Sequence, residues 1–179
     1  FEKLTDIIYL LIVFGIIIIV IVIGYRGVLF GAGEEAACKN WVYFQSIPVL
    51  KEIKSFSSPC ITTEETIKDN DNNKIYEQLA RNMYTCWSQY GRGKIDFYSN
   101  IDFLGGTYCR ICSEINIDES IKNKKIDLDD FEVYLSNHRP PNNKETYAEF
   151  LTNTKEAKLD FGKGSLLLEP GKKLYTSFV

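Results

Sequence analysis

The feature that most constrains this chain is a run of 19 residues, 7–25, that carries no charged side chain and consists mostly of Ile, Leu and Val. As a helix rising about 1.5 Å per residue it would be about 28 Å long, close to the roughly 30 Å hydrocarbon core of a bilayer. The β-branched residues 16–23 are poor helix formers in water, but in lipid the backbone has to satisfy its own hydrogen bonds. We therefore expect a long N-terminal hydrophobic helix.

The flanks of this run fit a segment that meets a membrane interface. Tyr9 and Tyr25 stand where interfacial aromatic residues occur, and Lys3 and Arg26 flank the run. One basic residue on each side leaves the orientation undetermined. The run is longer than the apolar part of a secretory signal peptide, so we expect it to be retained. The side chains expected to contact the membrane or other copies are Ile7, Ile8, Leu11, Phe14, Ile18, Ile21 and Val22.

Phe1, followed almost at once by a hydrophobic segment, resembles the mature N-terminus of type IV pilins, whose leader is removed by a prepilin peptidase. The resemblance covers the first 30 residues. It implies a processed start and a helix that resides in the membrane before packing with copies of itself in a filament core. The sequence departs from the bacterial pattern in one place, because Thr5 stands where those pilins carry Glu.

A cluster of glycines after the run, Gly24, Gly27, Gly31 and Gly33, predicts a break in the helix. We therefore divide the chain into a hydrophobic segment, residues 1–31, and an extracytoplasmic domain, residues 32–179. The formal net charge is −3 and no run of Lys or Arg exceeds two residues, which argues against nucleic acid as a partner.

The domain is expected to be α+β, because helical and strand-like patterns both occur in it. Strand 107–117 should turn Cys109, Ile111, Ser113, Ile115 and Ile117 inward. The C-terminal strand lacks a polar tail, so we expect more chain beyond it. The expected elements are a helix over 34–46, a loop over 56–73, a helix over 74–90, strands at 95–98 and 107–117, capped helices beginning at Asp129 and near Asn142, and a hairpin pairing 165–168 with 174–179 around a type II turn.

All five cysteines follow the hydrophobic run, and in a domain outside the cytoplasm such cysteines are usually disulfide partners. Cys38 and Cys60 bracket a loop of about 20 residues, whose closure is worth about 3 kcal/mol. Cys86 lies on the apolar face of its helix and Cys109 on the apolar face of its strand, so we expect these two to pair. Cys112 is the alternative partner of Cys86, since connectivity does not follow from sequence.

Cys109-Arg-Ile-Cys112 also has the spacing of a redox dithiol, or of half a zinc site completed by Cys86 and His138. A redox C-x-x-C motif usually begins a helix, whereas this one lies in a strand-like stretch. The acidic residues Asp127, Asp129, Asp130 and Glu132 could bind calcium, but helix capping explains them. We therefore predict no metal and no cofactor.

No pattern typical of catalysis is present. His138 is the only histidine and lies in an expected loop, and no G-x-S-x-G motif supplies a nucleophile. Gly91-Arg-Gly-Lys94 lacks the spacing of a phosphate-binding loop and is interpreted as a helix end followed by a turn. No residue is assigned a catalytic role.

Residues 86–97 and the run Tyr108-Cys-Arg-Ile-Cys112 resemble a pattern in uncharacterised single-span proteins of small-genome archaea. The resemblance covers residues 1–150 and implies an anchored, cysteine-bearing domain without a known activity.

The leading hypothesis is a non-enzymatic structural or adhesive subunit of a pilus-like filament on the cell surface, assembled through the N-terminal helix. The first alternative is a single-pass membrane protein with an extracytoplasmic binding domain, either alone or as a subunit of a membrane complex. The second alternative is an anchored thiol enzyme.

Overall fold

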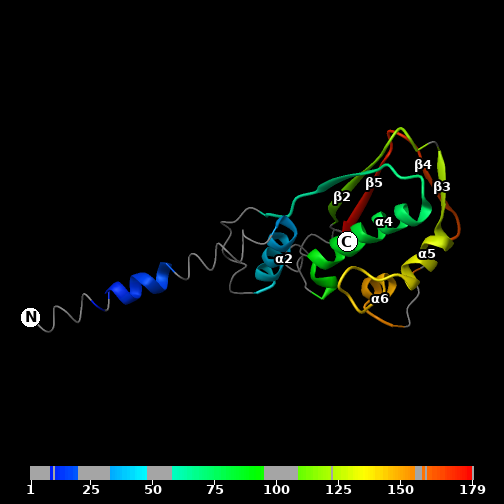
Figure 1. The fold of residues 1–179 in the computed structure, drawn as a ribbon. Helices are drawn as coiled ribbons and strands as arrows, with labels where there is room; N and C mark the ends of the chain where they lie inside the picture. The colour runs from blue at the N-terminus through cyan, green and yellow to red at the C-terminus, as the bar shows by residue number, and fades with distance from the viewer. Residues whose placement is uncertain are drawn as a thin grey trace, which may run out of the picture.

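The head of the molecule contains both helices and strands and is α+β as expected (Figure 1). This computed structural model describes residues 9, 11–19, 33–47, 58–94, 109–121, 123–155, 159 and 161–178. The elements are α2 (Glu34–Gln45), β1 (Thr63–Ile67), α4 (Asn72–Gln89), the short 3-10 helix η1 (Gly91–Gly93), β2 (Arg110–Ile117), β3 (Lys124–Asp127), α5 (Leu128–Asn137), α6 (Tyr147–Thr152), β4 (Ser165–Leu168) and β5 (Lys173–Phe178).

The expectation of a long N-terminal hydrophobic helix is wrong. Helical structure is described here at Tyr9 and at residues 11–19. Among the described residues, no helix is both long and apolar enough to cross a membrane. An apolar run does not by itself set the length of a helix, because Ile and Val have lower helix propensity than Ala or Leu. Ile7, Ile8, Ile21, Val22 and the boundary at residue 31 lie outside the described residues.

The strands form two sheets with a connectivity that differs from the expected one. In the three-stranded sheet the order is β1-β2-β5, with β1 parallel and β5 antiparallel to β2, while β3 and β4 form an antiparallel pair. The expected hairpin is therefore wrong, because β4 pairs with β3 and β5 with β2. Its turn is correct: Lys172 N donates to Glu169 O at 3.1 Å and Gly171 has a φ of 77°.

Two strands were not expected. β1 falls inside the segment interpreted as a loop, and its sequence, TEETI, lacks a regular apolar pattern because only Ile67 at its end is buried. β3 is only four residues long. The strand expected at 95–98 lies outside the described residues.

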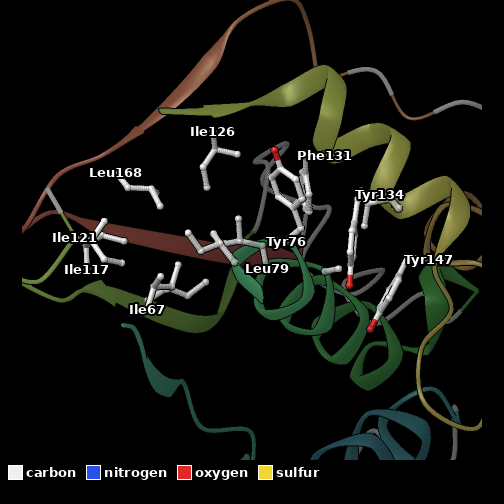
Figure 2. Packing of buried hydrophobic residues seen from close by; sticks show 14 of the residues in the cluster. Ile67, Tyr76, Leu79, Ile117, Ile121, Ile126, Phe131, Tyr134, Tyr147 and Leu168 are labelled. Atoms are coloured by element: carbon white, nitrogen blue, oxygen red, sulfur yellow. The ribbon is translucent and has the colours of Figure 1, made fainter. Parts of the chain in front are cut away.

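The main core surrounds α4, the amphipathic helix expected from its three- and four-residue spacing of apolar side chains. One face of α4 packs against the three-stranded sheet, and α5, α6 and the β3-β4 pair pack around it (Figures 1 and 2). Buried residues come from every one of these elements: Ile67, Ile75, Tyr76, Leu79, Ala80, Ile115, Ile117, Ile121, Ile126, Phe131, Tyr134, Leu135, Tyr147, Ala148 and Leu168.

A second, smaller core joins α2 to the C-terminal part of α4. Val42 and Tyr90 are buried there among four cysteines, with Trp41 and Trp87 packed against them. Because α2 is only weakly amphipathic, these contacts and the cysteines, rather than a broad apolar face, attach it to the rest of the head.

A β-bulge in β2 changes which side chains of that strand face inward. The register shifts between Ile111 and Ser113, so Ile111 is 41% exposed while Cys112 and Ser113 are both buried. Ile115 and Ile117 face inward as expected. A bulge opposes two residues to one on the neighbouring strand, and the strict alternation assumed from the sequence fails at that point.

The helix caps lie a few residues away from their expected positions. Asp127 caps α5 by accepting hydrogen bonds from Asp129 N and Asp130 N. In α6 the capping box is formed by Thr146 and Glu149, not by residues 142 and 145. Both corrections follow from the same rule: several Ser, Thr, Asp and Asn residues compete for the cap, and the one that accepts from the free N–H groups is set by where the chain turns.

Candidate functional site

Two disulfides converge in the smaller core. Cys38 is bonded to Cys60 with their Cα atoms 4.6 Å apart, and Cys86 is bonded to Cys112 with a Cα separation of 5.5 Å. The first bond is the expected one. The second corrects the expected pairing with Cys109, because the bulge in β2 turns Cys112 toward α4 and leaves Cys109 exposed as a free thiol. Such bonds form and persist in oxidising compartments.

The disulfides also remove the chemical alternatives considered for the cysteines. Cys86 and Cys112 are bonded to each other, so neither is available as a thiolate ligand for zinc. For the same reason Cys109 and Cys112 do not form a redox pair with each other. Within the part of the chain that the structure describes, no group of three or more His, Cys, Asp or Glu side chains could hold a metal ion.

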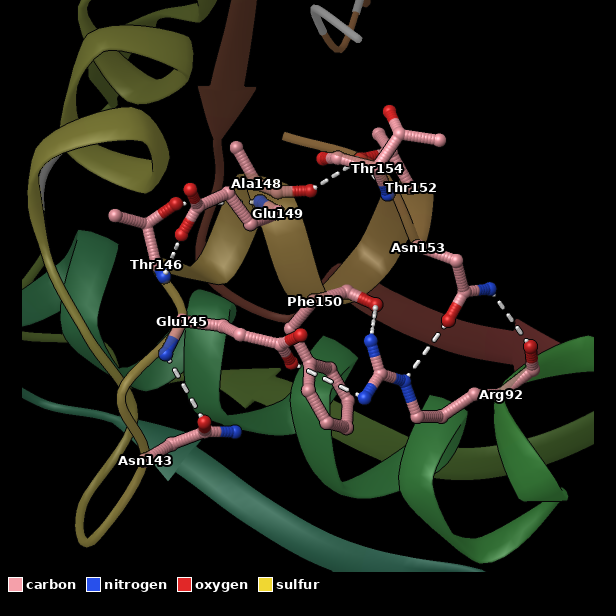
Figure 3. Close-up of polar contacts among 10 residues, drawn as sticks. All are labelled: Arg92, Asn143, Glu145, Thr146, Ala148, Glu149, Phe150, Thr152, Asn153 and Thr154. Carbon is pink, nitrogen blue, oxygen red and sulfur yellow. Dashed lines mark hydrogen bonds and ion pairs between the residues drawn. The ribbon is translucent and has the colours of Figure 1, made fainter. Parts of the chain in front are cut away.

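Arg92 lies at the centre of a polar cluster that joins the end of α4 to α6 (Figure 3). Its guanidinium donates to Asn153 Oδ1 at 2.9 Å and to Phe150 O at 3.4 Å, forms an ion pair with Glu145 at 3.1 Å, and stacks 4.1 Å from the centre of the Phe150 ring. The Asn153 amide returns a hydrogen bond to Arg92 O at 2.8 Å. The Gly91–Lys94 turn therefore has a structural role, because the side chain of Arg92 bonds to residues in and next to α6.

The remaining polar residues considered from the sequence also have structural partners. The Nδ1 atom of His138 lies 2.9 Å from Tyr134 O, and the His138 ring is stacked on the Tyr134 ring at 3.9 Å. Asp127 caps α5, and Asp129 and Asp130 lie in the first turn of that helix. These residues are accounted for by local structure.

Three core tyrosines are held in the neutral form. Burial, followed by the negative charge of Glu77, raises the pKa of Tyr134 to about 12. Burial also raises the pKa of Tyr147 and of Tyr76, the latter helped by Asp130 and Asp127. They pack as aromatic neighbours in the main core, with Tyr76 5.5 Å from Phe131 and 5.6 Å from Tyr134 between ring centres (Figure 2).

Two of the cavities lined by described residues of the head are large enough to consider as sites. One, of about 460 Å³, is mostly apolar and lies between α4 and the inner side of β5, with Leu79, Met83 and Leu174 among its walls. The other, of about 390 Å³, lies between α2, β1 and α4; we name it the polar cavity. Its polar side chains are Glu35, Thr63, Glu65, Arg81, Asn82, Thr85 and Gln89. No sequence pattern indicated it, because the residues come from three separated segments.

The N-terminal segment presents a different kind of surface. Leu11, Phe14 and Ile18, which the sequence assigned to assembly or membrane contact, are 64%, 59% and 47% exposed. The other large apolar residues described in this stretch are exposed as well, namely Tyr9, Ile12, Val13, Ile16, Ile17 and Ile19, so no side of it is covered by the described part of the head.

Comparison of the chain with protein-family models, with curated proteins and with solved structures finds no match.

Proposed function

We propose that this protein is a non-enzymatic structural or adhesive subunit displayed outside the cytoplasm, which presents the disulfide-bonded head and associates with other copies through residues 9–19. The observation that carries the proposal is the exposure of apolar side chains around the whole circumference of this stretch. A helix that is apolar on all sides is stable only when it is covered, and a patch of this kind on a protein surface marks an interaction site.

The disulfides support the extracytoplasmic part of the proposal. Both bonds lie in one buried cluster. One connects α2 to the segment before β1 and the other connects α4 to β2, at a place where the smaller core alone offers little apolar area. A head stabilised in this manner suits a protein that has to remain folded in an oxidising environment.

A second candidate follows from the same side chains. Aliphatic and aromatic residues that pack against other copies can also enter the apolar layer of a membrane surface. In that case the head is a binding domain held at the membrane, and copies of the protein do not pack against one another.

Sedimentation of the full chain after detergent removal tests the proposal. The chain should form large assemblies, visible as regular particles by electron microscopy. The double variant Phe14→Glu/Ile18→Glu should sediment as a monomer, because charges within an apolar contact have to be desolvated. Val133→Glu is the matched control: Val133 is 58% exposed on α5 of the head, and this variant should assemble as the wild type does.

Two results would contradict self-assembly. One is a wild-type chain that stays monomeric without detergent. The other is a wild-type chain that floats with lipid vesicles and forms no assemblies of its own, which would establish the membrane-bound candidate instead.

A further inference from the structure

The polar cavity between α2, β1 and α4 contains an organised hydrogen-bond network. Glu65 Oε2 accepts from the Gln78 side-chain amide at 2.9 Å and from the Asn82 amide at 3.0 Å, and Asn82 also donates to Gln78 O at 2.9 Å. Asn82 is only 5% exposed. Both N–H donors of Asn82 are therefore used, and the position of the Glu65 carboxylate is fixed from two sides.

Gln89, about two turns beyond Asn82 along α4, lines the same cavity and is 8% exposed. Its side-chain amide forms no hydrogen bond with another residue in the described part of the chain. Its polar atoms retain access to solvent, so the amide can hydrogen-bond water or a molecule that enters the cavity.

The charges at the cavity have both signs. Arg81 Nη2 lies 4.0 Å from Glu65 Oε2, at the limit of an ion pair, and the Arg81 side chain is 54% exposed. Glu35 contributes a second carboxylate from α2. A molecule bound here can meet both a guanidinium and carboxylates.

The walls also exclude several ligand classes. Among the lining residues that the structure describes, none is aromatic, so these side chains offer no stacking surface to a nucleobase or a sugar and no aromatic cage to a quaternary ammonium group. The apolar side chains among these described lining residues are Cys38 and Ile61. The volume of about 390 Å³ lies within the range of small-molecule sites.

We propose that the polar cavity binds a free α-amino acid as its zwitterion. Arg81 holds the carboxylate, Glu65 and Glu35 hold the ammonium group, and the Gln89 amide and Asn82 Oδ1 hydrogen-bond the polar atoms that reach the buried end. Both charged groups of the ligand are needed, because each is paired with a charge of opposite sign.

Equilibrium dialysis of the full chain against each of the twenty radiolabelled L-amino acids in turn tests this site. At least one should be retained at one molecule per chain. Unlabelled analogues that lack either the ammonium or the carboxylate group should displace it at least about tenfold less effectively than the amino acid itself, as expected for the loss of a charge-assisted hydrogen bond.

Variants locate the binding. Arg81→Met and Gln89→Leu should each weaken retention about tenfold or more, and Arg139→Met, which removes an exposed arginine outside the cavity, should leave it unchanged. Arg81 is half exposed, so its variant tests the site even where Gln89→Leu lowers the yield of folded protein.

Retention of no amino acid would overturn the proposal. So would equal displacement by an analogue with a single charged group, or undiminished retention by Arg81→Met. None of these results depends on residues 9–19, so the binding site in the polar cavity and the proposed assembly are tested independently.

Discussion

At the scale of single residues, Gly93 shows how one backbone position limits the sequence. It follows α4 with a φ of 66°, and a Cβ atom there would lie 2.9 Å from Cη2 of Trp87. L-residues are disfavoured in the left-handed region, and the indole ring adds a steric conflict within the smaller core.

Gly93→Ala should therefore lower the free energy of unfolding by more than the left-handed conformation alone costs, which is about 1–2 kcal/mol. Gly162→Ala is the matched control, because Gly162 has a φ of 76° but open space around its Cβ position. Urea denaturation of both variants measures the difference. Equal losses would show that the Trp87 ring moves aside without cost.

The pKa of Tyr134 makes stability depend on alkaline pH. An unfolded tyrosine ionises near pH 10, whereas burial and the charge of Glu77 raise the pKa of Tyr134 to about 12 in the folded protein. Its contribution to stability is complete below about pH 10 and is lost as the pH rises toward 12, because only the unfolded chain releases the proton in that interval.

Tyr134→Phe should reduce the loss of stability between about pH 10 and pH 12, since Phe has no proton to release in the unfolded chain. The measurement is the midpoint of urea unfolding across this range, with the thiol of Cys109 blocked. Tyr175→Phe, at a position 53% exposed on β5, is the control and should keep the wild-type pH profile. An identical profile for Tyr134→Phe would contradict the assignment.

At the scale of elements, the polar contacts between α6 and the end of α4 centre on one side chain, that of Arg92. α6 has six residues and is too short to be stable alone, so its capping box and the Arg92 cluster hold it in place (Figure 3). Lysine has the charge of arginine but not the planar set of donors that reaches Asn153, Phe150 and Glu145 together.

Arg92→Lys should lower the free energy of unfolding by about 1–3 kcal/mol, the range for losing hydrogen bonds made by a charged group. Arg139→Lys, at an exposed position, should change it by less than about 0.5 kcal/mol. Hydrogen exchange should show faster opening of α6 in Arg92→Lys, and unchanged exchange there would mean that the capping box alone secures the helix.

At the scale of the whole molecule, the smaller core depends on the Cys86–Cys112 bond, which connects α4 to β2 across 26 positions of sequence. Because a disulfide restricts the unfolded chain, its removal from a small domain costs about 2–5 kcal/mol. The pairing also leaves one thiol among the five cysteines.

The double variant Cys86→Ala/Cys112→Ala should have a free energy of unfolding in urea that is about 2–5 kcal/mol lower than that of the wild type. The free energy of unfolding of Cys109→Ser should lie within about 0.5 kcal/mol of the wild-type value. Thiol counting on the denatured, unreduced wild type should give one thiol, and Cys109→Ser should give none. A Cys109→Ser protein that loses stability, or a wild type with five thiols, would contradict the pairing.

The parts of the fold that the sequence predicted are those governed by local rules. α4 followed from its periodic apolar face, the turn at Glu169–Lys172 from Pro and Gly, and the α+β class from the mixture of patterns. β1 was missed because a short edge strand with one buried residue has no periodic signal. The polar cavity was missed because its walls come from segments that are distant in the sequence.

By itself the sequence determined that apolar residues gather at one end, that a cysteine-bearing α+β head follows, and that Cys38 and Cys60 are suitably spaced to pair. Only the tertiary structure decided which strands are neighbours and that the bulge at Ile111–Ser113 turns Cys112, and not Cys109, toward Cys86. Periodicity reports how a side chain is oriented within its own element, whereas strand pairing and register depend on contacts between distant segments, and one extra residue in a strand reverses which side chains face the core.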